Sequence, residues 1–311
     1  MTHTVLITGG AGFIGSHTVD LLLQKKYKIK ILDNFSTGTL NNLPVNNSNL
    51  EIITGDICDL NACIKAAQNC NYIIHLAAQV SVVKSIKDPY QSFKTNMLGF
   101  INILETMRNN HHINKIIFPS SAAIYGNNQN LPLLENDISD NQLSPYALEK
   151  LNAERYLKLY AKLYNIKYTI LRYFNIYGTR QNPLSPYSGV ISKLIYCYDK
   201  NQPFTIHGDG NQTRDFINVK DAVYANLLAL TKGDNQTYNI ATGKESSILD
   251  LLAIFQQQST KNNINVEYRE QRPGDIKHSL ASINKAKSEL GFTCQYGISS
   301  IKELSGTINI G

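Results

Sequence analysis

The chain has 311 residues, of which 42% are hydrophobic and 17% are charged, and its net charge is +6. Nothing in this composition indicates disorder, and enough apolar surface is available to bury a substantial core. The basic residues are scattered along the chain, which disfavours nucleic acid as a partner. The net charge fits a mildly basic solvated surface, and the alternative is a basic cleft that attracts a polyanionic substrate such as a nucleotide diphosphate.

The cysteines and the first residues bear on where the protein works. Five cysteines are present, with no CxxC pair, which favours reduced thiols over a disulfide framework or a metal site. The chain begins without the charged and apolar regions of a signal peptide, and no apolar run is long enough to span a bilayer. We therefore expect a cytoplasmic protein that binds no metal and contacts no membrane.

The first half of the chain alternates short β-branched apolar runs with amphipathic stretches. This alternation predicts an α/β fold, a Rossmann-type doubly wound parallel sheet with helices on both faces. The expected strands are 4–8, 29–32, 51–54, 72–76, 115–119 and 168–172, and the expected helices are 13–26, 61–69, 90–110 and 146–164.

Beyond residue 173 the loops become longer and richer in Pro, Gly and Asn, with helices expected near 187–200 and 219–232. We therefore predict two domains, a Rossmann domain over residues 1–175 and a smaller C-terminal mixed α/β domain over 176–311. The segment 215–242 is a candidate to cross back, because 238–241 would suit a further strand of the main sheet.

A glycine-rich turn follows the first expected strand, with Gly9, Gly10, Gly12 and Gly15 opening a helix. Read from Gly10 it is GxGxxG, in which glycines allow a tight turn, close approach of a pyrophosphate and close helix packing. Asp33 ends the second strand about 20 residues later, where a carboxylate binds ribose hydroxyls and repels a 2′-phosphate. The pattern predicts an NAD site. The alternative for Asp33 is a turn-capping residue.

Other residues at the same edge of the sheet are expected to contact the dinucleotide. Small residues that end the fourth strand would let the cofactor lie close, and the residues after the third strand would flank the adenine. With Gly9, Gly12, Gly15 and Asp33, the expected contacts are Phe13, Ile14, Asn34, Asp56, Ile57, Leu76, Ala77, Ala78, Tyr146, Lys150 and Tyr173.

Tyr146 and Lys150 are four residues apart on an expected helix, so their side chains share one face. A nearby ammonium and a positive nicotinamide would lower the pKa of the tyrosine, and its phenolate would take a proton from a sugar hydroxyl. Ser121 ends the fifth strand and would hydrogen-bond the reacting oxygen. The alternatives are a chance YxxxK string and a small residue at a tight strand end.

Six motifs resemble the extended short-chain dehydrogenase/reductase family and, within it, the UDP-sugar 4-epimerases. They occur in family order over most of the chain. They are TGGAGFIGSH (8–17), HLAAQ (75–79), SSAAIYG (120–126), YALEK (146–150), RYFNIYG (172–178) and RDF (214–216).

The resemblance implies NAD-dependent inversion at C4 of a UDP-hexose. Tyr146 would take the 4-hydroxyl proton while hydride passes to NAD, and the resulting 4-keto sugar would turn and take the hydride back on its other face. Lys150 would position the nicotinamide ribose and lower the pKa of Tyr146, and Ser121 would hold O4. NAD would stay tightly bound. The two domains would then hold NAD and the nucleotide sugar, respectively.

The resemblance also implies the substrate contacts. Asn175 matches the residue that contacts the diphosphate, while Arg214 and Arg272, with Asp275 nearby, match phosphate and uridine-ribose contacts. Two arginines suit a diphosphate by their fork geometry, although surface salt bridges are the alternative. The expected residues of the hexose pocket are Ser81, Val82 and Lys84, and a solvated lysine is the alternative for the last.

Three positions discriminate among related activities. The related 4,6-dehydratases carry an Asp-Glu pair where Ala122 and Ala123 stand here, and alanine cannot transfer a proton. Ser279 stands where epimerases restricted to glucose and galactose carry a tyrosine, so we expect UDP-N-acetylglucosamine and UDP-N-acetylgalactosamine to be accepted. The alternatives are a UDP-glucose/galactose or UDP-uronate 4-epimerase and, outside enzymes, an NAD-binding sensor or scaffold.

The expected helix 146–164 is apolar over most of its circumference, which requires burial on two sides. Relatives pair this helix and the one at 90–110 across a two-fold axis, so we predict a homodimer. The apolar positions are Leu148, Leu151, Tyr156, Leu159, Tyr160 and Leu163.

Overall fold

The computed structural model describes residues 3–183, 189–258, 264–271 and 276–304. In this part of the chain, seven parallel strands form one sheet in the order β10-β6-β5-β4-β1-β2-β3. This is the doubly wound order extended by one strand, which confirms the α/β Rossmann prediction. The strands are β1 (Thr4–Thr8), β2 (Lys28–Asp33), β3 (Leu50–Thr54), β4 (Tyr72–His75), β5 (Lys115–Ser121), β6 (Lys167–Tyr173) and β10 (Gln236–Ile240).

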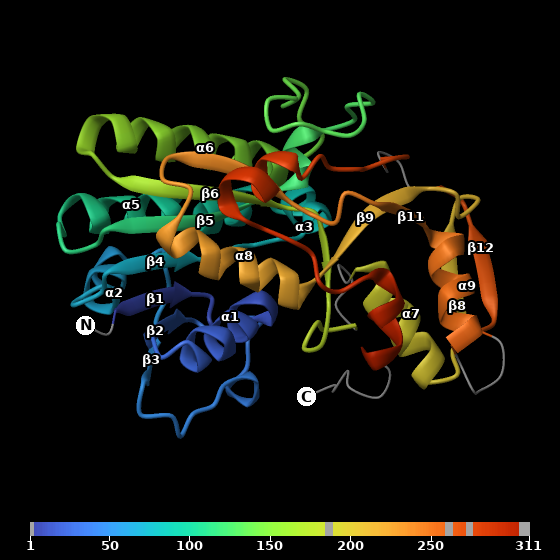
Figure 1. The fold of residues 1–311 in the computed structure, drawn as a ribbon, viewed down its shortest axis with the longest axis horizontal. Coiled ribbons are helices and arrows are strands. Elements are labelled where there is room, and N and C mark those ends of the chain that lie inside the picture. Colours follow the sequence, from blue (N-terminus) through green and yellow to red (C-terminus); the bar gives the residue numbers. More distant parts are fainter. Residues whose placement is uncertain (1–2, 184–188, 259–263, 272–275, 305–311) are drawn as a thin grey trace.

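Helices cover both faces of this sheet (Figure 1). In β1, Leu6 belongs to one apolar cluster, and its neighbours Val5 and Ile7 belong to the other. Consecutive side chains of a strand point to opposite faces, so an unbroken apolar run fits a strand covered on both sides. One face carries α1 (Phe13–Gln24) and α8 (Val219–Thr231), and the other carries α2 (Leu60–Ala66), α5 (Gly99–Arg108) and α6 (Pro145–Tyr164).

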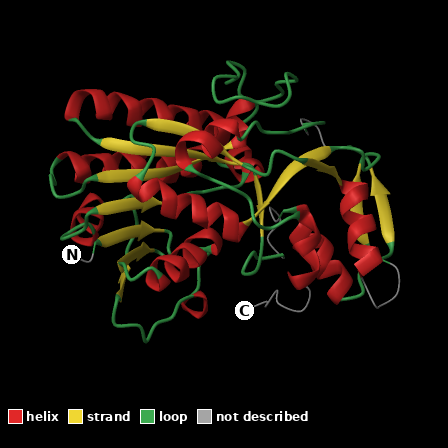
Figure 2. Ribbon diagram, viewed as in Figure 1, coloured by secondary structure: helices red, strands yellow, loops and turns green. Residues whose placement is uncertain are grey.

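A second group of elements forms a smaller unit at the right of Figures 1 and 2. Its helices pack around an apolar cluster that includes Leu194, Ile206 and Phe255. One small sheet holds β7 (Asn175–Tyr177), β9 (Thr213–Asn218) and β11 (Glu245–Ser247), and β8 (Phe204–His207) pairs with β12 (Val266–Arg269). The helices are α7 (Val190–Asp199), α9 (Ile248–Gln258) and the 3₁₀ helix η5 (Ile298–Leu304).

The crossing suggested by the sequence is present, because β10 pairs in parallel with β6 and α8 packs on α1. The structure adds a helix that the sequence did not predict, α3 (Val82–Lys87). The expected helix 90–110 consists of α4 (Pro89–Phe93), the π-helical turn η2 (Lys94–Leu98) and α5. The short elements η1 (Leu40–Asn42), η3 (Ala122–Tyr125) and η4 (Ala286–Leu290) complete the described chain. No helix in the described ranges has the length and apolarity to cross a membrane.

Candidate active site

The glycine-rich turn between β1 and α1 leaves no room for side chains at two positions. Gly9 has a positive φ of 71°, and a Cβ at Gly15 would lie 2.1 Å from the carbonyl oxygen of Gly9. Gly12, by contrast, would place a Cβ near the Gly9 oxygen alone, at 3.3 Å. Gly12 is also the N-cap of α1 and supplies no capping side chain. The first N–H groups of α1 therefore suit a phosphate, which fits the predicted NAD site.

Asp33 ends β2 beside this turn and is buried, with 7% of its surface exposed. Its Oδ2 accepts a hydrogen bond from the Ala11 N–H at 2.9 Å, and its Oδ1 accepts one from the Phe35 N–H at 2.8 Å. The carboxylate therefore caps two turns, as the alternative interpretation held. It also stands at the carboxyl end of β2, where contact with an NAD ribose requires it.

Asn34 and Asp56 face each other across the ends of β2 and β3. The Asn34 amide donates to Asp56 Oδ2 at 2.9 Å, and the Cys58 N–H donates to Asp56 Oδ1 at 2.8 Å. Burial acts to raise the pKa of Asp56, but these hydrogen bonds outweigh it and lower the pKa. The side chain of Ile57 belongs to the apolar core cluster on one face of the sheet. The expected contact of Ile57 with adenine would therefore be made by its backbone.

The end of β4 is fixed by a hydroxyl from β1. Thr8 Oγ1 accepts from the Ala77 N–H at 3.2 Å and bonds the His75 Nδ1 at 2.9 Å. Leu76 and Ala78 line the cavity that is described below, while Ala77 packs on the core. Of these three residues predicted to contact NAD, two therefore face the cavity and one, Ala77, packs against the core.

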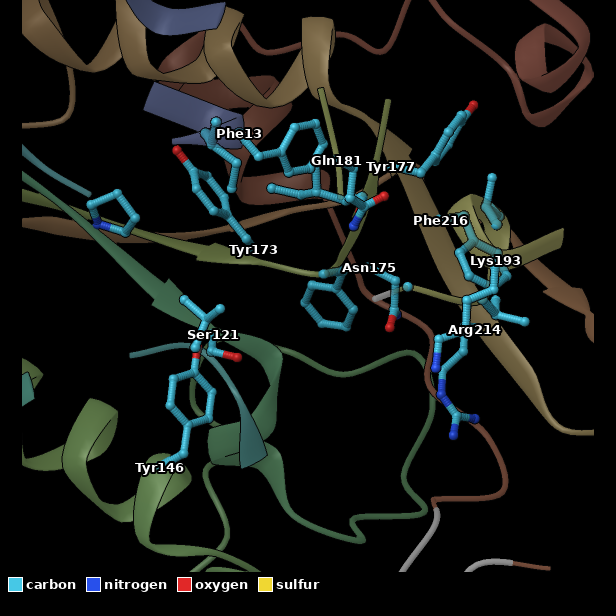
Figure 3. Close-up of a pocket in the computed structure, with 18 of the residues that line it drawn as sticks. Phe13, Ser121, Tyr146, Tyr173, Asn175, Tyr177, Gln181, Lys193, Arg214 and Phe216 are labelled. Carbon is cyan, nitrogen blue, oxygen red and sulfur yellow. The ribbon is translucent and has the colours of Figure 1, made fainter. Parts of the chain in front are cut away.

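A cavity of about 530 Å³ lies between the carboxyl edge of the main sheet and the smaller unit (Figure 3). Phosphate-binding and catalytic groups are expected at this edge in doubly wound folds. Its lining includes these residues predicted from the sequence: Phe13, Ile14, Leu76, Ala78, Ser121, Tyr146, Lys150, Tyr173, Asn175 and Arg214.

Ser121 and Tyr146 point toward one another at one end of this cavity (Figure 3). Ser121 is the last residue of β5, and its Oγ accepts from the Ala123 N–H at 3.1 Å. Tyr146 lies in the first turn of α6, which begins at Pro145 after the capping residue Ser144. Strand end and helix start thus bring the two hydroxyls together, as predicted from the sequence.

Lys150 lies one turn further along α6 and is buried. Its Nζ donates to the carbonyl oxygen of Pro119 at 2.9 Å and lies 4.9 Å from the ring centroid of Phe118. Burial lowers the pKa of Lys150 to about 8, although the negative charges of Glu149 and Glu154 act against this shift. A buried, readily deprotonated ammonium therefore stands beside the tyrosine.

The pKa of Tyr146 differs from the sequence-based expectation. Burial raises this pKa, and the hydrogen bond with Ser121 only partly opposes the shift. Lys150, whose Nζ is bonded to Pro119, does not lower the pKa of Tyr146 in the protein alone. The expected lowering of this pKa therefore depends on the positive charge of the bound nicotinamide.

The opposite end of the cavity carries polar groups from the smaller unit. Asn175 on β7 donates to the carbonyl oxygen of Asp215 at 3.2 Å, and Arg214 on β9 donates to that of Thr213 at 2.8 Å. Figure 3 shows Arg214 far from Tyr146, with Asn175 between them. The sequence did not predict the lining residues Lys193, His207 and Phe216. Phe216 belongs to the RDF motif (214–216), which could have pointed to it, whereas no motif distinguishes Lys193 and His207 from the amphipathic pattern of their elements.

Several expected hexose contacts lie outside this cavity. Ser81 is buried and its Oγ caps α3 by accepting from the Lys84 N–H at 2.9 Å, while Val82 and Lys84 are exposed on α3. Val80 lines the cavity instead. The unpredicted helix α3 explains the difference, because it turns this segment away from the cavity.

The substrate contacts expected nearest the C-terminus either do not line this cavity or lie outside the described residues. Ser279 is buried and does not line the cavity. Arg272 and Asp275 lie outside the described residues. Among the described residues, no three His, Cys, Asp or Glu side chains are arranged to hold a metal ion.

The profile of the NAD dependent epimerase/dehydratase family matches residues 5–241. The chain therefore belongs to this family, and it is an enzyme with NAD as its cofactor. The glycine cradle at Gly9 and Gly15 fits that cofactor.

Individual relatives narrow the comparison. The chain is 45% identical over 286 residues to a putative UDP-glucose 4-epimerase of Methanocaldococcus jannaschii, covering 91% of each chain. It is 38% identical to the solved UDP-N-acetylglucosamine 4-epimerase of Methanobrevibacter ruminantium in complex with UDP-N-acetylmuramic acid, with a TM-score of 0.92 and coverage of 99% and 97%. It is 30% identical to the UDP-glucuronic acid 4-epimerase of Bacillus cereus, solved with UDP-glucuronic acid and NAD, with a TM-score of 0.88 and 97% of both chains covered.

Proposed function

We propose that this enzyme interconverts the C4 epimers of a UDP-hexose through a 4-keto intermediate. The observation that carries the proposal is the convergence of Ser121, Tyr146 and Lys150 at one end of a cavity whose other end presents Asn175 and Arg214. The first group suits proton transfer at a sugar hydroxyl, and the second suits a diphosphate. All three relatives named above are UDP-sugar 4-epimerases by name.

The side chains would divide the work as follows. Bound NAD supplies a reversible hydride acceptor for C4. Tyr146 takes the proton of the 4-hydroxyl and later returns it, while Ser121 holds O4 through its hydroxyl. Lys150 would position the nicotinamide ribose, and together with the positive nicotinamide its charge would favour the Tyr146 phenolate once NAD is bound.

Inversion requires that the 4-keto sugar present its other face to the same residues. Arg214 and Asn175 would hold the diphosphate at the far end, so the hexose would turn while the nucleotide stays bound. The cavity volume of about 530 Å³ leaves space for a hexose to rotate. A dehydratase is disfavoured, because Ala122 and Ala123 follow the strand-end serine in η3 and carry no transferable proton.

We further propose that N-acetylated hexoses are accepted, because Ser279 matches the position at which relatives restricted to glucose and galactose carry a bulky tyrosine. Ser279 itself is buried and lies outside the cavity lining, so its small size would act through the packing behind the wall. The similarity to the Methanobrevibacter UDP-N-acetylglucosamine 4-epimerase supports this substrate. UDP-glucose/galactose and UDP-uronates are the competing substrates. The Methanocaldococcus relative is named for UDP-glucose and the Bacillus relative for UDP-glucuronic acid, and both are similar to this chain. An NAD-binding sensor would not need Ser121, Tyr146 and Lys150 together.

The organisation that we propose for the working enzyme is a homodimer of two-domain chains. Residues 1–175 would bind NAD and residues 176–311 the nucleotide sugar, with 236–240 returning to the main sheet. Helix α6 leaves Leu148, Tyr156, Leu159 and Leu163 exposed, as an unpartnered interface would. The five free cysteines suit the reducing cytoplasm.

An NMR time course with UDP-N-acetylglucosamine, UDP-glucose and UDP-glucuronic acid in parallel tests the proposed activity. Appearance of the C4 epimer of the N-acetylated sugar, faster than the others or alone, is the expected result. Conversion of UDP-glucose alone would reject the proposed acceptance of N-acetylated hexoses, while the proposed 4-epimerase activity would stand. Conversion of none of the three would reject the proposed function.

A further inference from the structure

Glu149 is a buried carboxylate on the helix that carries Tyr146 and Lys150, with 5% of its surface exposed. Its Oε2 accepts hydrogen bonds from Ser92 Oγ and from Asn96 Nδ2, both at 2.7 Å. We propose that Glu149 is a positioning residue that fixes α6 against α4 and η2 and balances the ammonium of Lys150. This inference rests on the catalytic roles proposed above.

The same carboxylate is linked to the loop that follows β4. Asn96 Oδ1 accepts from the Gln79 N–H at 2.8 Å, and Asn96 Nδ2 donates to the Gln79 carbonyl oxygen at 2.9 Å. Gln79 comes directly after Ala78, which lines the cavity. Glu149 therefore connects the catalytic helix, through one asparagine, to the strand end where the cofactor is expected. A buried amide held at three points is a rigid connection, since leaving any of these groups unpaired is costly.

The charges around Lys150 explain why Glu149 is the relevant carboxylate. Helix α6 brings two carboxylates near Lys150, Glu149 and Glu154, and β4 brings the buried imidazole of His75. Glu154, however, is already paired with the guanidinium of Arg172 on β6, at 2.7 Å. The charge of Glu154 is therefore largely neutralised, and Glu149 remains to balance Lys150.

The partners of Glu149 leave its own charge intact. Ser92 and Asn96 are neutral, and the lysines of α3 and η2 that flank this region, Lys84, Lys87 and Lys94, are exposed. Within the described residues, no ion pair joins Glu149 to any of these lysines. In the buried interior a full negative charge acts strongly on its neighbours, because the effective dielectric constant is lower than in water.

Glu149 acts in the same direction on two titrating groups. Its charge opposes the lowering of the Lys150 pKa by burial, and it adds to the raising of the Tyr146 pKa. Removing the charge should therefore lower both pKa values. The pH range of activity should move to lower pH as a whole, which loss of packing alone would not produce.

The test is Glu149→Gln, which keeps the size and an oxygen that can accept from Asn96 and Ser92. Lys150 is followed by the ¹³C shift of its Cε in lysine-labelled protein, assigned by comparison with Lys150→Met, and kcat is measured against pH. We expect the Lys150 titration and the alkaline limb of kcat to move down by about one pH unit. NAD content should not change. Glu51→Gln, an exposed carboxylate on β3, removes the same net charge and should move neither.

An unmoved Lys150 titration in folded Glu149→Gln overturns the proposal. Ser92→Ala is the second variant, because it removes one hydrogen bond to Glu149 and keeps the charge. We expect it to lower kcat about 2- to 10-fold without moving the titration, and a shift as large as that of Glu149→Gln would also overturn the proposal. The Lys150 titration needs no turnover. A wild-type protein that converts no UDP-sugar would thus reject the proposed function, whereas the Lys150 titration would still test the role of Glu149.

Discussion

Arg172 and Glu154 form a two-point ion pair inside the protein, with Nε to Oε1 at 2.9 Å and Nη2 to Oε2 at 2.7 Å. Both side chains are only 1% exposed. Nη1 of Arg172 also donates to the Tyr125 hydroxyl at 2.9 Å. The pair therefore joins β6 to α6, the helix that carries Tyr146 and Lys150, and to η3, which directly follows Ser121 on β5.

Removing one partner of this pair should be costly. Glu154→Gln leaves the Arg172 guanidinium buried without its counter-charge, and we expect it to lower the free energy of unfolding by about 3–5 kcal/mol. Urea denaturation followed by circular dichroism measures the change. The matched control is Glu51→Gln, which breaks the more exposed Lys30–Glu51 pair and should cost less than about 1 kcal/mol. Equal losses in the two variants would contradict the argument.

The glycine turn offers a pair of substitutions with different consequences. In Gly15→Ala the new Cβ would lie 2.1 Å from the Gly9 oxygen, so the turn must distort and both stability and NAD binding should fall. In Gly12→Ala the nearest atom is at 3.3 Å, so the fold should survive while the methyl group obstructs the phosphate. Thermal unfolding and NAD titration separate the two effects. Normal NAD affinity in both variants would mean that the dinucleotide binds elsewhere.

These glycines also illustrate what the sequence alone could predict. The turn, Asp33, Ser121 and Tyr146 occupy the ends of regular strands or the start of a helix, and strand order fixes their places in space. Local patterns were therefore sufficient to predict the parallel sheet and to place Ser121 and Tyr146 at the same end of the cavity.

The opposite end of the cavity, which carries Asn175 and Arg214, was less predictable for a physical reason. Lys193, His207 and Phe216 reach the cavity from three separate elements, whose packing depends on contacts distant in the chain. The short helix α3 after β4 was not predicted, because it depends on one local hydrogen bond that Ser81 accepts as its cap. Ser81, Val82 and Lys84 were expected at the hexose, and α3 places them outside the cavity.

Tyr146→Phe removes the proposed acid/base while leaving the ring packed beside Ser121. We expect loss of at least about 100-fold in kcat, the contribution typical of a positioned acid/base group. NAD should remain bound at its normal ratio, as measured by absorbance after denaturation. Tyr268→Phe, the same change at an exposed tyrosine on β12, serves as control and should be active. Near-normal epimerisation by Tyr146→Phe would assign the proton transfer to another residue.

The activity should decline in mildly alkaline solution. Burial lowers the pKa of Lys150 to about 8, so this lysine loses its proton as the pH rises through 8, well below the range of an ordinary lysine. If its charge supports the Tyr146 phenolate, kcat falls on that side of the profile. Lys150→Arg stays charged at higher pH and should show no such fall, although at a lower maximal rate because the guanidinium has a different shape. A wild-type kcat that stays constant to pH 10 would show that the charge of Lys150 does not support the Tyr146 phenolate.

The outer side of α6 gives the last prediction. Leu159 and Leu163 are 48% and 59% exposed, on the part of the helix remote from Tyr146. Aliphatic side chains clustered on one exposed helix face indicate a surface that is covered in the working protein.

The double variant Leu159→Glu/Leu163→Glu places charges on that face, where burying them against a second copy is unfavourable. In light scattering we expect a mass near 34.8 kDa for the variant and twice that for the wild type. Leu40→Glu, an exposed leucine on η1, is the control and should remain a dimer. A wild type that is already monomeric at micromolar concentration would leave the exposed face of α6 for another partner.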